Sequence, residues 1–450
     1  MSSIPVQTVA RPAGKTQMQG SFAVIQSIAS KVVILGLQAG TGILTARALR
    51  PAGRGELAAM ILWPLFAASV TTLGVPSSLI YHLRRYPEER DRLVANGFLI
   101  SGIMGVFAAL GMSLALPWWL RQYSPSIVHA AEWFLLTVPL CSVTLAGRAV
   151  LEASHDFSAS NAIQTLTPFA TLVGLLLFLS FHHINPFTAA LSYIIASIPA
   201  FWLMAVRLRR IGLRSASVKA PMMKRILGYG VRSYGIDVLG TLALQVDQVL
   251  VVSMLSPSAM GSYVVVLSLS RMLNLFQNSV VMVLFPKAAG RSATEVVGMT
   301  GDAARISSMV TAVCGIFVVL TGPTLLRILY GSEYVAAAGA LRILVIEVVL
   351  SGATFVLAQA FMALDHPGVV TILQAVGLSL SIPMMLWLIP RYGIYGAAIA
   401  LLTSTSARLI FVCAGFKVFL KTKPPNLLPQ PGDIRFLIGT VARLRGERAL

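Results

Sequence analysis

Long apolar stretches follow one another along this chain, separated by short polar segments. Residues 93–120 and 306–326, for example, contain no charged side chain. A helix needs roughly 20 apolar residues to cross a bilayer, so such stretches predict membrane-spanning helices. A window of about 19 residues predicts twelve of them, at 22–46, 57–80, 93–116, 130–151, 159–182, 187–207, 229–254, 259–285, 306–328, 336–363, 369–390 and 394–416.

Composition narrows the class of protein further. Of the 450 residues, 56% are hydrophobic and 11% are charged, whereas soluble proteins carry about 25% charged residues. The segment before residue 22 lacks an apolar core beside a cleavage site, so we expect no removable signal peptide. The three cysteines lie inside predicted spans, without the spacing of a disulfide framework or a metal site, so we expect no metal and no cofactor. The chain is predicted to be an all-α polytopic membrane protein.

The formal net charge of +19 is distributed unevenly. With twelve spans, both termini and the even-numbered connections lie on one side of the membrane. That side holds 24 of the 35 Lys and Arg residues, and the opposite connections hold seven. The positive-inside rule therefore predicts that both termini are cytoplasmic. The excess charge marks topology, and no nucleic-acid partner is expected.

The longest connection, residues 207–225, divides the spans into six and six. We expect a cytoplasmic tail at 1–21, an N-lobe at 22–207, a basic linker at 208–228, a C-lobe at 229–416 and a basic tail at 417–450. In that last tail, apolar residues recur at helical spacing between 434 and 444 with arginines interleaved. This pattern is typical of a helix lying on the anionic inner leaflet, and a frayed tail is the alternative.

The two halves contain similar short motifs. "ALRPAGRGEL" (48–57) and "MLSPSAMGSY" (254–263) share Leu, Pro and Gly at an offset of 206 residues, and each follows the first span of its half. A weaker match relates 151–164 to 361–374 at an offset of 210. An even number of spans in each half makes the two lobes parallel to one another. Repeats of this kind are a transporter architecture, with the substrate site between the halves.

Several charged residues fall inside the predicted spans, where a Lys or Arg at the helix centre costs roughly 2.5–3.5 kcal/mol. They are expected to face the interior, an aqueous cavity or the membrane interface. The cations are Lys31, Arg232, Arg271 and Arg408, and the acids that matter most are Asp237, Asp247 and Glu347.

Helical periodicity places several of these charges on polar faces. Lys31 shares a face with Gln38, and Arg271 shares one with Asn274 and Asn278. Arg232 lies near a helix end and can snorkel to the interface. Arg148 and Glu152, spaced i,i+4, are expected to form a local ion pair.

Asp247 and Arg271 lie on adjacent antiparallel spans. Counted from the turn at Ser256–Pro257, they are about 13 and 20 Å deep at 1.5 Å per residue. Two arrangements are open: a direct ion pair, or two charges that line one cavity.

The motifs around residues 46–60 and 245–272 resemble those of the polysaccharide-export flippases of the multidrug/oligosaccharidyl-lipid/polysaccharide superfamily. In that family an Arg and a Leu-Gly-Pro turn precede a Gly-x-Tyr that opens the next helix. Gly261-Ser262-Tyr263 matches the last element, and Asp247 matches an Asp common in the seventh span. "LFPKAAG" (284–290) is also similar. Arg50 and Ser256 depart from the pattern, because the family often has Gly at these positions.

The resemblance implies two lobes that open alternately to the two sides of the bacterial cytoplasmic membrane, where the chain would be a multi-pass protein. It implies as cargo a polyprenyl-diphosphate-linked oligosaccharide, flipped from the inner to the outer leaflet for exopolysaccharide or lipopolysaccharide biosynthesis. Membrane lipids, glycosyltransferases and a polysaccharide polymerase are the expected partners.

The polar spans suit this cargo, since cations bind phosphates and amides bind sugar hydroxyls. The expected substrate-binding residues are Lys31, Gln38, Arg271, Asn274, Asn278 and Arg408, with Lys31 opposite Arg271. The expected coupling or orienting carboxylates are Asp237, Asp247 and Glu347. No Walker A motif occurs, so the energy must come from the substrate gradient or from an H⁺ or Na⁺ gradient.

Three other functions are compatible with a twelve-span chain. A multidrug exporter of the same fold would need an acidic, aromatic cavity. The predicted central charges, three cations and three acids, are balanced and do not distinguish an exporter from a flippase. A major-facilitator transporter would carry Gly-x-x-x-Asp-Arg-x-Gly-Arg-Arg where this chain reads "HLRRYPEERDRL" (82–93). A membrane glycan polymerase or ligase would need a large external loop, which the connections do not supply. We therefore expect a transporter and not an enzyme.

Overall fold

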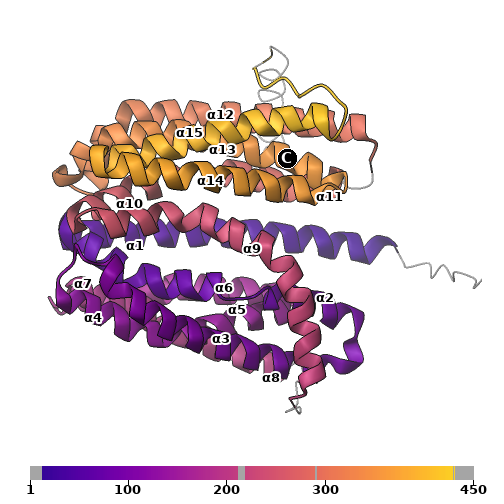
Figure 1. The fold of residues 1–450 in the computed structure, drawn as a ribbon, viewed down its shortest axis with the longest axis horizontal. Helices are drawn as coiled ribbons and strands as arrows, with labels where there is room; N and C mark the ends of the chain where they lie inside the picture. The colour runs from indigo at the N-terminus through magenta and orange to yellow at the C-terminus, as the bar shows by residue number, and fades with distance from the viewer. Residues whose placement is uncertain (1–12, 211–217, 289–290, 429, 431–450) are drawn as a thin grey trace, which may run out of the picture.

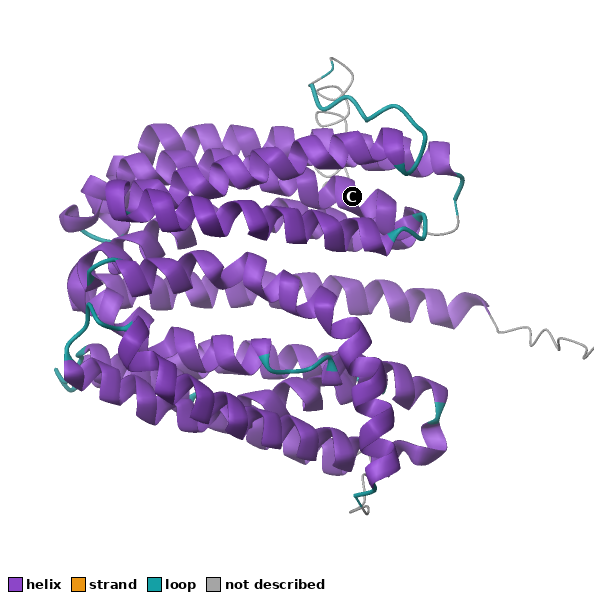
Figure 2. Ribbon diagram, viewed as in Figure 1, coloured by secondary structure: helices purple, strands orange, loops and turns teal. Residues whose placement is uncertain are grey.

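The computed structural model of the chain describes residues 13–210, 218–288, 291–428 and 430. Within these ranges all regular secondary structure is helical (Figure 2). In Figure 1 the helices form two stacked bundles whose long axes run in nearly the same direction. This arrangement confirms an all-α fold.

The first bundle contains α1 to α8. Its elements are α1 (Ala13–Val70), α2 (Val75–Arg85), η1 (Pro87–Glu89), α3 (Arg90–Trp119), α4 (Pro125–Phe134), η2 (Leu135–Thr137), α5 (Val138–Ala153), α6 (Phe157–Ser180), α7 (Pro186–Ile195) and α8 (Ser197–Arg210). The long helix α9 (Ala220–Met254) follows. The second bundle contains α10 (Pro257–Arg271), α11 (Asn274–Ala288), α12 (Ala293–Leu329), η3 (Ser332–Ala337), α13 (Ala338–Ala363), α14 (Pro367–Tyr392) and α15 (Ile394–Val418).

The number of crossings agrees with the sequence prediction of about twelve. Among the described residues, ten helices are long and apolar enough to cross a membrane, and the bent pair α10–α11 is an eleventh. Helix α1 is kinked at Arg50, which has φ 59° directly before Pro51. Because each side of this kink is about long enough to span, α1 supplies two crossings, and the total is twelve.

Several spans are broken at positions that hydropathy alone did not reveal. The chain leaves helical geometry between α1 and α2, where Leu73 and Gly74 have φ of 46° and 68°. A Cβ on Gly74 would lie 2.2 Å from the carbonyl oxygen of Gly230, so only glycine allows α9 to pass this close. Between α10 and α11 the axis bends by 44°.

Helix α9 belongs to both bundles. Its N-terminal part packs against α2 and α3, and the rest packs against α14 and α10 (Figure 1). Its first turn is at Ala220, earlier than the predicted span start at 229, and α1 likewise begins at Ala13 and not at 22. Hydropathy finds the apolar part of a helix, whereas both helices continue beyond it. Because helix ends do not define lobe boundaries, the predicted linker between the N-lobe and the C-lobe, at 208–228, stays a prediction.

The predicted tails fall largely outside the described residues. Residues 1–12 and the proposed interfacial helix within 433–448 are not described. Helix α15 ends at Val418, close to the predicted end at 416.

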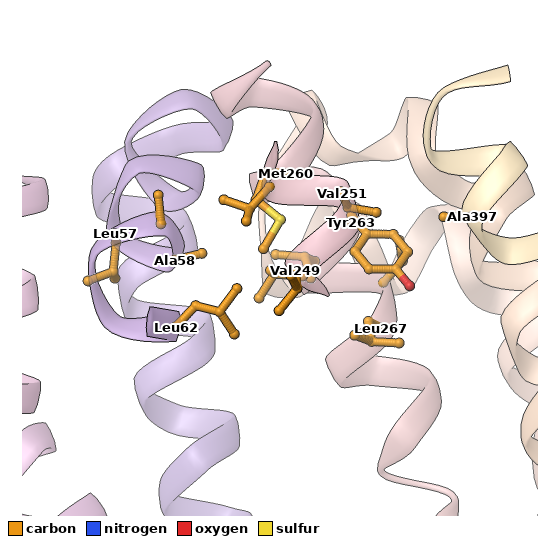
Figure 3. Close-up of a cluster of buried hydrophobic side chains, with 14 of the residues drawn as sticks. Leu57, Ala58, Leu62, Val249, Val251, Met260, Tyr263, Leu267 and Ala397 are labelled. Carbon is orange, nitrogen blue, oxygen red and sulfur yellow. The ribbon is translucent and has the colours of Figure 1, made fainter. Parts of the chain in front are cut away.

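A hydrophobic core joins the two bundles at one end of the molecule. We call this the elbow end, because it contains the two repeated turns, 49–55 and 255–261; the opposite end is the linker end. Leu57, Ala58 and Leu62 of α1 lie in one buried cluster with Met260 of α10 and Val249 of α9 (Figure 3). Residues from α13 and α15 continue the same cluster. Apolar packing therefore joins the two bundles at the elbow end.

Candidate functional site

Asp247 and Arg271 form a direct ion pair inside the second bundle. Nη2 of Arg271 lies 3.0 Å from Oδ2 of Asp247. The Tyr263 hydroxyl donates to the same oxygen at 2.9 Å, and Nη1 of Arg271 donates to the carbonyl of Leu244 at 3.2 Å. The Asp247 side chain is 1% exposed and that of Arg271 is 32% exposed. The acid is therefore fixed, while part of the guanidinium faces outward.

Glu347 and Arg408 belong to a second polar group nearby. The Thr405 hydroxyl donates to Oε1 of Glu347 at 2.7 Å. Arg408 donates to the Thr405 hydroxyl at 3.1 Å and to the amide oxygen of Gln374 at 3.3 Å. Glu347 also interacts electrostatically with Arg271. The two groups thus form one network with two cations and two acids, supplied by α9, α10, α13, α14 and α15.

Lys31 lies between the bundles, but not where the sequence placed it. Its ammonium group donates to Sδ of Met282 on α11 at 3.5 Å. Met282 is eleven residues beyond Arg271, which is about 16 Å at 1.5 Å per residue. The expectation that Lys31 lies opposite Arg271 is therefore wrong. The sequence predicts one continuous eighth span at 259–285. In the structure this span bends by 44° between α10, which contains Arg271, and α11, which contains Met282.

Lys31 does face the predicted asparagine stripe. Asn274, Asn278 and Met282 recur every four residues and share one face of α11. Gln38 lies two turns from Lys31 along α1, which runs antiparallel to α11, and therefore reaches the level of these asparagines. The side chains of Gln38 and Asn278 are exposed. A cation and two amide side chains on α1 and α11 are thus exposed near the contact between Lys31 and Met282.

Asp237 is separated from the other two predicted carboxylates. Its Oδ2 accepts a hydrogen bond from the Ser77 hydroxyl of α2 at 3.0 Å. Asp237 lies ten residues nearer the linker end than Asp247 on the same helix. It therefore faces the first bundle, whereas Asp247 is buried in the second.

Sequence reasoning did not single out Gln277, which lies between the two predicted asparagines. Its amide nitrogen donates to the Thr311 hydroxyl of α12 at 2.6 Å, in a buried contact. This polar segment contains exposed residues such as Asn278 and buried ones such as Gln277, and helical periodicity did not distinguish the two kinds.

The repeated turns contact one another at the elbow end in a reciprocal way. A Cβ on Gly55 would lie 1.8 Å from the carbonyl oxygen of Pro257, and a Cβ on Gly261 would lie 1.9 Å from that of Pro51. Each glycine of one repeat therefore packs on the proline of the other. We call this contact the glycine knuckle. The repeat found in the sequence is also a point of close backbone contact between the two halves.

Arginines and tyrosines add further contacts between the bundles at the elbow end. Arg47 donates to the carbonyl of Leu329 at 2.9 Å and to that of Ile328, at the C-terminus of α12. The Tyr334 hydroxyl donates to the carbonyl of Ala46 at 3.1 Å. Positive side chains stabilise the last carbonyls of a helix, so Arg47 is a cross-bundle cap. The sequence had accounted for it only as a loop charge.

Few contacts join the first bundle to α11–α15 at the linker end. The tight contacts there are made by α9, as in Ser78 Oγ donating to the Ile226 carbonyl at 2.9 Å and the Arg225–Glu89 ion pair at 2.6 Å. In the described residues, the two bundles are therefore closed together at the elbow end and bridged mainly by α9 at the linker end.

A family model for polysaccharide biosynthesis proteins matches residues 23–289. The chain belongs to this family. The match covers the first bundle, α9 and α10–α11, and so includes both repeated turns and the Asp247–Arg271 pair. No curated protein shows a significant sequence match.

The chain shares its fold with solved transporters of the MOP superfamily. The lipid II flippase MurJ in an inward closed conformation matches with a TM-score of 0.73 and 14% identity, over 89% of this chain and 88% of that one. An inward-facing multidrug resistance MATE family transporter of the MOP superfamily matches with a TM-score of 0.70 and 15% identity, over 86% and 95%. A MOP superfamily transporter from Pyrococcus furiosus matches with a TM-score of 0.58 and 14% identity, over 89% and 95%.

Proposed function

We propose that this protein flips a polyprenyl-diphosphate-linked oligosaccharide across the bacterial cytoplasmic membrane by alternating access. The observation that supports this most is the glycine knuckle. It joins equivalent turns of two repeats at one end, while the other end is bridged by α9. Two repeats that touch at one end can rock about that contact, which is how many transporters with internal repeats work.

The orientation of the chain follows from its charges. The described even-numbered connections lie at the linker end, and the sequence assigns 24 Lys and Arg residues to their side of the membrane and seven to the opposite side. The linker end is therefore cytoplasmic under the positive-inside rule, as are both termini. In this orientation the structure is closed toward the outside, and cargo would approach from the leaflet where cytoplasmic glycosyltransferases finish it. A polymerase would take it up on the other side.

The bordering residues suit an anionic glycolipid. Lys31, Gln38, Asn274 and Asn278 offer a cation and amides between the bundles, and Arg271 and Arg408 present guanidinium groups within the second bundle. Among the carboxylates, Asp237 is the exposed one and is the candidate for H⁺ or Na⁺ coupling. Asp247 already orients Arg271, and Glu347 accepts from Thr405, so these two carboxylates hold the cations in place.

The test uses purified protein in lipid vesicles that contain a polyprenyl diphosphate with a short fluorescent oligosaccharide. Flipping is read as the fraction of label that a membrane-impermeant quencher can reach over time. We expect wild-type protein to accelerate flipping, Lys31→Ala to slow it, and Arg391→Ala, at the elbow end, to leave it unchanged. Ethidium transport is measured in parallel. Transport of ethidium without any flipping of the glycolipid would instead show a drug exporter.

A further inference from the structure

Three cavities adjoin one another along the first bundle, starting at the linker end. The outermost, of about 500 Å³, lies between α2 and α9 and is lined by Tyr81, Arg84, Arg85 and Tyr229. It shares Ser77 and Ile80 with a second cavity of about 350 Å³. The second shares Ser69, Leu145 and Arg148 with a third cavity of about 270 Å³. The three cavities therefore lie in a row from the linker end into the bundle, and each shares lining residues with the next.

The linings of the second and third cavities differ in polarity. The second is the more polar of the two and has a mixed lining, with hydroxyl and carboxylate groups from Ser69, Thr72, Ser77, Glu152, Asp237 and Thr241. The third is mainly apolar and lies among α1, α5, α6, α7 and α8. Its lining includes Ile61, Leu65, Ala68, Ile163, Ile194 and Ala200. Leu65 is 54% exposed, so this cavity opens at the surface of the bundle.

Arg148 lies at the boundary between these two cavities. Its Nη2 is 3.7 Å from Oε1 of Glu152, a loose version of the local pair expected from the i,i+4 spacing. That Glu152 oxygen already accepts a hydrogen bond from the Ser160 hydroxyl at 2.7 Å. The Nε of Arg148 is buried and has no hydrogen-bond partner among the described residues. An unsatisfied buried donor is costly, and an anion bound beside Arg148 would supply the missing acceptor.

We propose that this junction binds the diphosphate of an anionic isoprenoid lipid, with Arg148 as its anchor. The start of the apolar chain would occupy the third cavity, and the first sugars would lie in the second, where hydroxyls and carboxylates pair with sugar hydroxyls. The proposal rests on the proposed function for the identity of the cargo. It adds a site in the first bundle that is separate from the cation network of the second.

The depth of Arg148 in the membrane fits this assignment. Arg148 is five residues before the end of α5 at Ala153, or about 7.5 Å along the helix axis from the linker-end turn. The headgroups of a bilayer occupy the outer several ångströms on each side. The lipid's diphosphate therefore reaches Arg148 from the leaflet at the linker end with little change in depth.

The test measures binding to the purified full-length protein with three probes: geranylgeranyl diphosphate, geranylgeraniol and inorganic diphosphate. We expect the first probe to bind most tightly, because it alone places a diphosphate at the junction and an apolar chain in the third cavity. Arg148→Gln should weaken its binding at least about ten-fold, the loss that a charge-assisted hydrogen bond carries, and should leave geranylgeraniol unchanged. Thr144→Phe, which narrows only the apolar cavity, should weaken both chain-bearing probes and spare inorganic diphosphate.

Glu152→Gln separates binding from a structural role. It keeps an acceptor for Ser160 but removes a negative charge beside the phosphates, so geranylgeranyl diphosphate should bind more tightly. Arg391→Ala is the matched control and should bind all probes as wild type does. If Arg148→Gln folds and binds geranylgeranyl diphosphate as wild type does, or if an Arg271→Ala variant shown to be folded fails to bind it, the assignment to Arg148 is overturned.

The vesicle assay keeps this proposal distinct from the proposed function. Wild-type flipping that Arg148→Gln leaves unchanged would refute the site and keep the flippase. Binding of geranylgeranyl diphosphate through Arg148 without any flipping by the wild type would keep the site and refute the flippase.

Discussion

Substitution of Gly261 by alanine should open the elbow end. The added Cβ would lie 1.9 Å from the carbonyl oxygen of Pro51, and such contacts are essentially never shorter than 3.0 Å. Since that oxygen belongs to the backbone, no side chain can rotate away, and α1 and α10 must separate by roughly 1 Å. Overpacking of this kind costs about 1–3 kcal/mol. The elbow-open population should therefore rise about 5- to 150-fold.

The assay is the labelling rate of a buried cysteine. The three natural cysteines are replaced by serine, and Ala46→Cys is introduced, because Ala46 is 0% exposed and its carbonyl accepts from Tyr334 of the second bundle. When opening is fast relative to labelling, the rate follows the open population. Gly42→Ala is the control: it lies on α1, and its Cβ would meet nothing within 4 Å. Both changes bring the same gain in helix propensity, so their difference isolates the clash.

Equal labelling rates in Gly261→Ala and Gly42→Ala would refute the reasoning, because the knuckle would then not limit opening. Gly55→Ala should act in the same direction as Gly261→Ala, since its Cβ would lie 1.8 Å from the Pro257 carbonyl. Opposite effects of the two variants would show that the contact is not reciprocal.

Three further results are expected. Arg271→Ala leaves the buried Asp247 carboxylate without its cation and should lower the free energy of unfolding by about 3–5 kcal/mol. Adding Asp247→Asn should recover most of this loss in thermal unfolding, and no recovery would argue against the ion pair. Arg50→Gly keeps the backbone at φ 59° but relieves the strain of a side chain there, about 1–3 kcal/mol, and removes an exposed pair with Glu333 worth about 0–1 kcal/mol. Tm should therefore rise, and a fall would show that the ion pair contributes more than the strain costs. A cysteine at Lys219 should react with an impermeant reagent only from the cytoplasmic side, and labelling of intact cells from outside would reverse the topology.

The membrane-spanning layout could be predicted because hydropathy reports the solvent of each segment directly. The Asp247–Arg271 pair was one of two arrangements left open, since both residues were placed at similar depth on neighbouring antiparallel helices. The glycine knuckle was visible as a repeat, because the same residues make the same contact from both sides.

The remaining features depend on how helices are rotated and bent relative to one another. Periodicity placed Lys31 on a polar face, but it did not show that the α10–α11 bend puts Met282, and not Arg271, opposite it. Arg148 was interpreted as half of a local ion pair, because i,i+4 spacing describes only one helix. Its position at the junction of two cavities is set by α1, α6 and α9, which sequence spacing on α5 does not report.

Helix α9 opens the second half of the sequence, but its first turns pack against the first bundle. Tyr229 stacks on Tyr81 of α2 with ring centroids 4.4 Å apart, and Arg225 lies 3.7 Å from the centre of the Tyr86 ring. We call the first turns of α9 the strap, because they belong to the second half of the sequence and are held by side chains of the first half. A chain cut ahead of α9 would yield two fragments that still recognise each other through this strap, as domain-swapped partners do. Side-chain contacts of the strap, in addition to the peptide link, therefore hold the start of α9 against the first bundle.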